Sequence, residues 1–283
     1  MAVSIITKLS SAFTDTTLPK LYRDPILTAG SMFLFDLANP FCWNPANTVA
    51  DGAVVNNLLD GAPGANLRIP SGTMTYVAGK GFQLSATATF QRIEIDSGTN
   101  YFQTNLTDDY LIQAWVKYPA TDPGAGNVGL IFNKGGSVIY SYGQPGPFLA
   151  SRYPAESINT AYGDITGKFD ANTATNTNYN NAAVGTVPGS HLFGLAKVGT
   201  NLQIYKDGAL IGSSALLTPA LTANSNTMNF GGSTIQSAVQ GTILNRISAE
   251  DLTVSASALG ISTAAQCAAQ IATEYAANSA RFV

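Results

Sequence analysis

Hydrophobic and polar residues alternate along much of the chain after about residue 66. In the run TFQRIEID (89–96), Ile93 and Ile95 fall on one face of an extended strand, and the charged residues around them fall on the other. Clusters of Gly, Asn, Asp and Pro separate such runs, as they do between short strands. We therefore expect strands at 74–78, 81–86, 89–96, 110–118, 128–135, 137–143, 190–198, 202–206, 209–214, 227–232 and 241–255.

A two-residue turn is the clearest local signal. The dipeptide Asp207-Gly208 stands between the apolar runs 202–206 and 209–214. An Asp-Gly pair supplies the two positive φ angles that a type I′ hairpin turn requires. The sequence therefore predicts a tight β-hairpin at this point.

The period changes towards the C-terminus, which predicts a helix. Apolar residues recur there at spacings of three and four, at Ile261, Ala265, Ala268, Ala272 and Tyr275. Thr263 is the expected N-cap, since threonine is among the residues that favour this position. The helix is rich in alanine and nearly without charge, so we expect it to lie against the sheet or against a partner.

Residues 1–65 lack the alternation, and five prolines interrupt them. Only SMFLFDL (31–37) is typical of a strand in this part of the chain. We expect an extended N-terminal arm over 1–65 that serves as a docking segment, a β-sandwich over 66–255, and a C-terminal helix over 256–283. The expected fold class is all-β, with many short strands packed in two layers.

The segment 153–187 differs from its neighbours, because it holds few large apolar residues and many Asn and Thr residues. We expect a long surface excursion with at most one strand. Long loops in compact domains are commonly functional or interaction elements. The segment is either an interface or a binding loop.

Charge is scarce. Only 11% of the 283 residues are charged, against about a quarter in an average globular protein. The balance of 14 basic and 17 acidic residues gives a net charge of −3, which offers no electrostatic attraction for nucleic acid. A hydrophobic share of 45% and an aromatic share of 10% exclude a disordered chain.

Neither an export signal nor a membrane span is predicted. The apolar run from Ala2 to Ile6 is shorter than the roughly 7–15 residues of a signal-peptide core. No stretch approaches the roughly 20 apolar residues of a span. We expect synthesis in the cytoplasm, no membrane insertion, and two buried thiols at Cys42 and Cys267, with a disulfide between them as the alternative.

Six segments follow one another in an order that matches a known family. They are GKGFQLSA (79–86), IEIDSGTNYF (93–102), DDYLIQAWVKYP (108–119), SHLFGLAKVGTNLQIYKDGALIGS (190–213), MNFGG (228–232) and RISAEDLTVS (246–255). This order resembles the concanavalin A-like (laminin G-like) jelly roll over residues 66–283. The resemblance implies a jelly-roll sandwich, a fold that lectins, glycosidases and structural modules share.

A second resemblance concerns the whole chain. The opening TLPKLYRDPILTAGSMFLFD (17–36), the Asn/Thr-rich body and the Ala-rich ending are similar to structural proteins of tailed-bacteriophage virions. Such proteins assemble in the host cytoplasm and need no export signal. The resemblance implies that the protein is located in the virion.

Two carboxylates share a strand face, but they do not complete a catalytic pattern. Glycosidases of the resembling fold place their acids as Glu-x-Asp-x-x-Glu. Glu94 and Asp96 fit the first two positions, and Thr99 stands where the third acid belongs. A retaining mechanism needs two carboxyls about 5–5.5 Å apart. We therefore expect no catalytic residue and place Glu94 on a solvated face beside Arg92.

Other chemistry has little support. His191 is the only histidine, no G-x-S-x-G elbow accompanies it, and a zinc site with two distant cysteines is not credible. We expect His191 to be structural. We expect no metal or other cofactor. Calcium is the alternative, because five aspartates lie near loops or in the 153–187 segment, although they lack the spacing of a calcium-binding loop: Asp96, Asp108, Asp109, Asp164 and Asp170.

Tyrosines in and after the middle strands are the candidate ligand-binding residues, with Tyr140, Tyr142 and Tyr153 foremost and Tyr162 and Tyr179 further along. Aromatic rings beside Asn and Gln suit sugar stacking. They also suit a subunit interface, which we favour.

These observations predict a non-enzymatic structural protein of a tailed-phage virion, in a tail, baseplate or fibre-attachment position. Its expected partners are other virion proteins and copies of itself in a symmetric oligomer, with host-surface glycans as a further contact. The alternatives are a capsid decoration protein, a carbohydrate-binding lectin module and, least favoured, a glycoside hydrolase.

Overall fold

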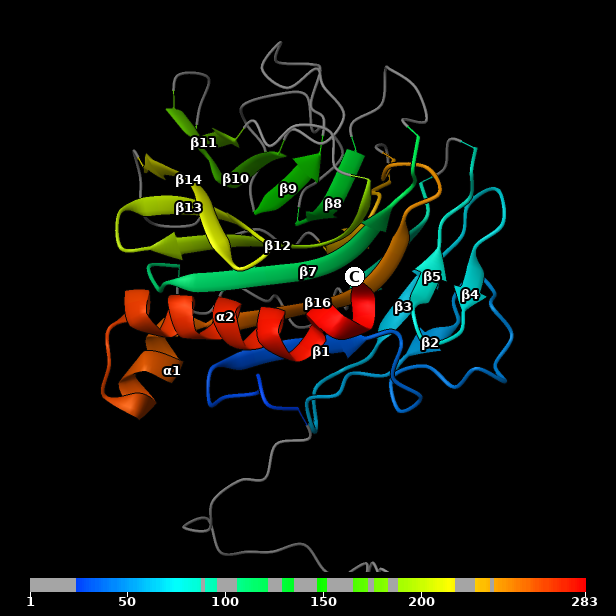
Figure 1. Cartoon of the computed structure of the whole chain (residues 1–283), viewed down its shortest axis with the longest axis horizontal. Helices are drawn as coiled ribbons and strands as arrows, with labels where there is room; N and C mark the ends of the chain where they lie inside the picture. The colour runs from blue at the N-terminus through cyan, green and yellow to red at the C-terminus, as the bar shows by residue number, and fades with distance from the viewer. Residues whose placement is uncertain are drawn as a thin grey trace, which may run out of the picture.

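Two antiparallel β-sheets face each other in the structure, a computed structural model (Figure 1). It describes residues 24–87, 90–95, 106–121, 129–134, 147–151, 165–172, 176–182, 188–216, 227–234 and 237–283. Every strand pair in both sheets is antiparallel, and the helices of the described chain follow the last strand. The expected all-β sandwich is confirmed.

Sheet A holds the long central strands. It comprises β1 (Ser31–Asp36), β4 (Thr75–Val77), β5 (Gly81–Gln83), β7 (Tyr110–Tyr118), β12 (Gly189–Val198), β13 (Asn201–Lys206), β14 (Ala209–Ala215) and β16 (Ile243–Asp251). Their order is β14-β13-β12-β7-β16-β5-β4, and β1 also pairs with β16. Strand β16 therefore has β7 on one side and shares its other side between β5 and β1.

Sheet B forms the second layer. It comprises β2 (Val54–Val55), β3 (Ala65–Arg68), β6 (Arg92–Ile95), β8 (Gly129–Asn133), β9 (Phe148–Ser151), β10 (Ile165–Asn172), β11 (Asn176–Ala182) and β15 (Met228–Gly231). Their order is β11-β10-β9-β8-β15-β6-β3-β2. Neighbours such as β15 and β6 are far apart in the sequence, so the sheet is built from long-range pairings.

The inner faces of the two sheets enclose one large apolar core. Ile93 and Ile95, the pair that the alternation places on one face of β6, are both fully buried in it. Trp43, which follows β1, packs edge-on against Phe82 of β5 with ring centroids 4.9 Å apart. The alternation works as a predictor because each strand turns one face to this core.

Two helices close the described chain, α1 (Leu252–Leu259) and α2 (Thr263–Phe282). Helix α2 runs across the outer face of sheet A (Figure 1). There Tyr275 stacks on Trp115 of β7 at 5.9 Å between ring centroids. The N-cap of α2 is Ser262 rather than Thr263, because the hydroxyl of Ser262 accepts the N–H of Ala265.

Residues 252–255 were expected to continue the last strand, but they begin α1 instead. The side chain of Asp251 accepts the N–H of Val254 and so caps the helix. Helix α1 ends at Gly260, which adopts the left-handed conformation at φ 67°. No single described helix has the length and hydropathy of a membrane span, and α1 and α2 pass such a test only together, with a 99° bend between them.

A buried ion network fastens α2 to the sheet. Arg246 of β16 donates to both oxygens of Glu274 on α2 and to Asp24 and Asp36. Burial alone would lower the pKa of the Arg246 guanidinium, but these three carboxylates raise it. Arg281 near the end of α2 donates to Asp36 as well, at 2.9 Å. Sheet, helix and the segment around Asp24 thus share one set of charges.

Much of the segment expected to be an arm lies inside the sandwich. Strand β1 pairs with β16, with Phe35 opposite Ile247, and β2 and β3 form one edge of sheet B. Pro40 and Pro45 lie in the turns that follow β1, so they interrupt the alternation without removing the strands. Residues 1–23 of the expected arm lie outside the described residues.

The 153–187 segment contributes two strands where at most one was expected. Strands β10 and β11 pair with each other, and β10 also pairs with β9. They stand at one end of sheet B, as Figure 1 shows. Strand β11 is an edge strand of this sheet and β10 lies next to it, and the polar composition of both strands concealed them.

The predicted Asp207-Gly208 hairpin is confirmed. It joins β13 to β14, and both turn residues have positive φ angles, 50° for Asp207 and 86° for Gly208. The expected strand at 137–143 lies outside the described residues.

Candidate functional site

One row of side chains crosses the outer face of sheet A. In the register, Gln83 of β5 lies opposite Ile243 of β16, and Ile243 lies opposite Lys117 of β7. The residues next to each of them point inwards, since Phe82, Val116 and Leu244 are core residues. The row therefore points away from the core.

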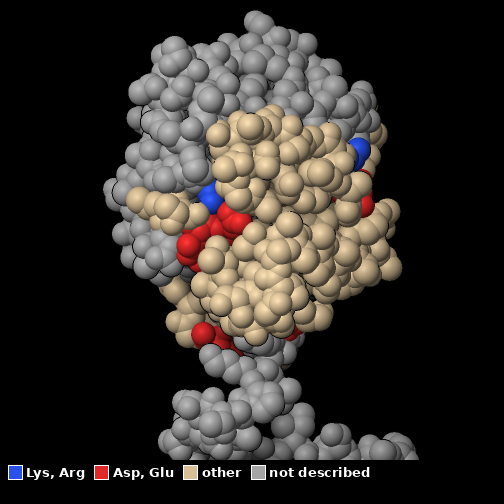
Figure 2. All heavy atoms as spheres, turned by 90° about the vertical axis from the view of Figure 1, so that its left-hand side faces the viewer, with Lys and Arg blue, Asp and Glu red and all other residues tan. Residues whose placement is uncertain are grey.

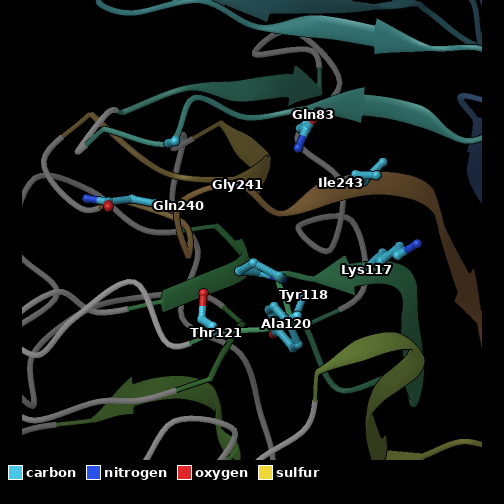
Figure 3. Close-up of a pocket in the computed structure, with 10 residues that line it drawn as sticks. Gln83, Lys117, Tyr118, Ala120, Thr121, Gln240, Gly241 and Ile243 are labelled. Carbon is cyan, nitrogen blue, oxygen red and sulfur yellow. The ribbon is translucent and has the colours of Figure 1, made fainter.

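A pocket of about 450 Å³ opens at this row (Figure 3). Its described lining consists of Gln83, Ala86, Lys117, Tyr118, Pro119, Ala120, Thr121, Gln240, Gly241 and Ile243. They come from the ends of β5 and β7, the start of β16 and the turns beside them. This volume lies in the range of small-ligand pockets, about 300–1,000 Å³.

The lining combines an apolar surface with a few polar groups. Ala86, Pro119, Ala120 and Ile243 are apolar, while Gln83, Lys117, Thr121 and Gln240 carry donors or acceptors. In Figure 3 the side chains of Lys117 and Gln240 end on opposite sides of the pocket. A ligand with apolar ring faces and several hydroxyls would match this arrangement.

Three of the polar groups are unsatisfied within the described structure. The side chains of Gln83, Lys117 and Thr121 make no hydrogen bond or ion pair with any described residue. They are also solvent-exposed. Such groups exchange water for a ligand without first breaking a bond within the protein.

A glycine turn shapes one wall of the pocket. Gly241 has φ 73°, and its N–H donates to the carbonyl of Ser85 at 3.0 Å. The N–H of Thr242 donates to the carbonyl of Val239 and closes the turn. A side chain at a positive φ is strained, so glycine is the residue that suits this bend.

Glu94, the acid weighed as a glycosidase residue, lies on sheet B and does not line this pocket. Its carboxylate accepts from Arg68 at 2.9 Å and from Arg92 at 3.0 Å. Burial opposes the ionisation of Glu94, but the two guanidiniums outweigh it and lower its pKa. A general acid needs a raised pKa, so this environment suits an ion pair. Asp96 and Thr99 lie outside the described residues.

The ion pair continues as a chain of hydrogen bonds over the outer face of sheet B. Arg92 donates to Asn229 of β15 at 3.1 Å, and Asn229 donates to Asn133 of β8 at 3.3 Å. Arg92, Asn133 and Asn229 are buried. Their polar groups bind one another, so this network holds four neighbouring strands together.

His191 forms a hydrogen bond with Asp207. The His191 Nδ1 atom lies 2.7 Å from an oxygen of Asp207, whose other oxygen accepts the N–H of Leu192. The contact ties the start of β12 to the turn of the β13–β14 hairpin. This geometry supports the structural role expected for His191.

Asp109, one of the calcium candidates, has hydrogen-bond partners on both of its carboxylate oxygens. One oxygen accepts from Lys197 and Gly199, and the other accepts from Thr263. Among the residues with described positions, no group of three or more His, Cys, Asp or Glu residues is arranged to hold a metal. Asp96 and Asp164 lie outside the described residues, and the side chain of Asp170 is not described.

Tyr140, Tyr142, Tyr153 and Tyr162 all lie outside the described residues, so their proposed role stays a prediction. Tyr179 lies on β11. The buried thiols are confirmed, since Cys42 and Cys267 are both buried and free. Burial raises the pKa of Cys267 to about 11 and raises the pKa of Cys42 further.

Known proteins resemble this chain in fold. No protein-family model matches the sequence, and no curated protein is similar to it in sequence. The structure resembles Trypanosoma rangeli sialidase in complex with sialic acid at 11% identity and a TM-score of 0.53, over 91% of this chain and 34% of that chain. It also resembles the receptor binding domain of botulinum neurotoxin D at 13% identity and a TM-score of 0.52, over 79% of this chain and 49% of that chain.

The chain thus spans between a third and a half of the length of these solved proteins. At such low identity the likeness establishes the β-sandwich fold. Activities of the whole sialidase or toxin domain are not carried over by it.

The pocket was missed at the level of sequence. Gln83, Lys117 and Ile243 are far apart in the chain, and only the pairing of β5, β16 and β7 brings them together.

Proposed function

We propose that this chain is a carbohydrate-binding β-sandwich module and that the pocket on sheet A is its binding site. The observation that carries the proposal is a set of polar side chains without a partner among the described residues, Gln83, Lys117 and Thr121, around an apolar-lined pocket of about 450 Å³. Sugars present apolar C–H faces and a rim of hydroxyls, which such a lining complements. The fold supports the proposal, since the solved structures that share it include a sialidase bound to sialic acid and a receptor binding domain.

Binding without turnover is part of this proposal. None of the described residues that line the pocket is acidic. Glycoside hydrolysis ordinarily uses a pair of carboxyls on either side of the bond that breaks. Glu94, the acid considered for that role, lies on sheet B and is held by two arginines.

The test is a glycan array with the full chain, followed by calorimetry of the ligands that bind. Gln83→Ala and Thr121→Ala should each weaken binding by roughly tenfold, since each removes one hydrogen-bonding group. Ser213→Ala, at an exposed position of β14 outside the pocket, is the matched control. Failure of every glycan to bind, or equal binding by the pocket variants, would reject the proposal.

A second proposal is the structural role in a tailed-phage virion. One observation favours an assembly role of this general kind. Val254, Leu259 and Ile261 in and after α1 are 41%, 60% and 44% exposed, and the helix carries no charged residue. Figure 2 faces the side of the molecule on which α1 lies in Figure 1, and its described surface carries few charged side chains. An uncharged apolar surface suits close packing against a neighbouring protein.

Light scattering of the purified full chain tests the assembly role. An oligomer that Leu259→Asp or Ile261→Asp dissociates would support it, whereas a monomer at high concentration would count against it. Localisation of the subunit in images of an intact particle would separate a tail position from a capsid position.

A further inference from the structure

The pocket carries a single formal charge among its described lining residues. Lys117 supplies it, and the other nine residues are neutral. Lys117 belongs to the central strand β7, which holds its backbone between β12 and β16. The sheet therefore fixes the position of its backbone beside the pocket, and its side chain is exposed.

Lys117 differs from the five cations of the described chain that are held in ion pairs. Ion pairs to carboxylates hold these five: Arg68, Arg92, Lys197, Arg246 and Arg281. Lys117 has no such partner among the described residues and is exposed. An ammonium at the edge of an apolar-lined pocket is a ready partner for an anionic group of a ligand.

The neutral polar groups lie elsewhere around the same opening. Gln83 and Thr121 also line it, and their side chains carry hydrogen-bond donors and acceptors that could bind sugar hydroxyls. In Figure 3 the ammonium of Lys117 projects to one side, away from Gln240 at the other end. The arrangement thus fits a molecule with a neutral hydroxylated ring and one negative charge at its end.

We propose that the pocket binds a sugar that carries a carboxylate, such as a uronic acid or a sialic acid residue, with Lys117 as the group that selects the charge. This inference rests on the proposed carbohydrate-binding function. The net charge of the chain is −3, so its overall field does not attract anions. A preference for an acidic sugar would therefore come from this local contact.

Four defined probes test the inference by calorimetry with the full chain. Sialyllactose is compared with lactose, and digalacturonic acid with its methyl ester, so that each acidic sugar has a neutral partner. At least one acidic member should bind about tenfold more tightly than its neutral partner, as a charge-assisted hydrogen bond provides. The two pairs separate a sialic acid from a uronic acid as the source of the carboxylate.

Lys117→Gln should abolish the difference between the acidic sugar and its neutral partner, and Lys117→Arg should retain it. Lys206→Gln is the matched control, because Lys206 is a lysine on β13 that likewise lacks a described ion pair and stands outside the pocket. It should leave binding unchanged. The preference should also fall as salt is raised, since salt screens exposed charges.

The outcomes distinguish the two proposals. Equal binding of acidic and neutral sugars, or a preference that survives Lys117→Gln, would overturn the inference and leave a neutral-sugar module. Failure of all four probes and of the glycan array would overturn the carbohydrate-binding proposal itself.

Discussion

The guanidinium of Arg246, on β16, binds both carboxylate oxygens of Glu274, on α2, at 2.8 and 3.0 Å. Both side chains are almost fully buried. Glu274 also accepts the indole N–H of Trp115 and an amide N–H of Asn278. The pair is therefore the main polar link between the helix and the sheet that it covers.

Removal of one member of this pair should destabilise the protein strongly. Glu274→Leu leaves Arg246 short of a partner inside the protein, and the expected loss is about 3–5 kcal/mol in the free energy of unfolding. Chemical denaturation measures it. The double variant Arg246→Met/Glu274→Leu should not recover this loss, because Asp24 and Asp36 then lose Arg246 as their partner. A single-variant loss below about 1 kcal/mol would contradict the expected role.

Gly194 allows α2 to approach sheet A closely. A Cβ atom at this position of β12 would lie 2.8 Å from Cδ1 of Ile271 and 3.3 Å from Cβ of Tyr205. Gly194→Ala should therefore cost about 1–2 kcal/mol of stability through overpacking. Ile271→Val removes the nearer atom, and the two substitutions together should cost less than the sum of their separate effects. Simple additivity in this double-mutant cycle would show that the contact is not strained.

Glu94 should make stability fall in acid. Its pKa is lower in the folded protein than in the unfolded chain, so its contribution is present above the unfolded pKa of about 4.3 and is lost as the pH falls through the folded value. Glu94→Gln should cost about 1–2 kcal/mol at pH 7. The difference between wild type and variant should shrink between about pH 5 and pH 3. A difference that stays constant over this range would mean that the ionised carboxylate is not the stabilising form.

Both thiols should resist modification in the native protein. Cys42 and Cys267 are buried, and burial raises the pKa of each, so the reactive thiolate is scarce at pH 8. Ellman's reagent should label neither residue natively and two thiols per chain in denaturant. Rapid native labelling would indicate that the shell around one of them opens readily. Fewer than two thiols in denaturant would indicate a disulfide.

Alternation predicted the sandwich because the core imposes it. Strands such as β6 turn apolar residues towards the other sheet, and this leaves a period of two in the sequence. Alternation failed as a predictor where a segment is not a strand with one apolar face towards the core. Strands β10 and β11 are polar strands at a sheet end, and residues 252–255 pass from strand to helix at a cap that alternation does not reveal.

The candidate site could not be predicted in the same way. The register that places Gln83, Ile243 and Lys117 in one row depends on which strands pair, and no local pattern encodes that choice. Sequence reasoning favoured tyrosines instead, because aromatic residues are visible as a cluster along the chain. Glu94 is the converse case, since Thr99 led us to expect no catalytic role for it, and the structure adds that Arg68 and Arg92 bind its carboxylate.

The central place of β16 in sheet A has a consequence for how the protein folds. Strands β1, β5 and β7 all pair with β16, which comes after every one of them in the chain. During synthesis the edges of these strands that pair with β16 stay unpaired until the chain has been made as far as Asp251, the end of β16. Long-range pairing of this kind is slow and leaves strand edges open to wrong partners. We therefore expect refolding yield to depend strongly on protein concentration, and nascent chains to benefit from a chaperone until β16 is in place.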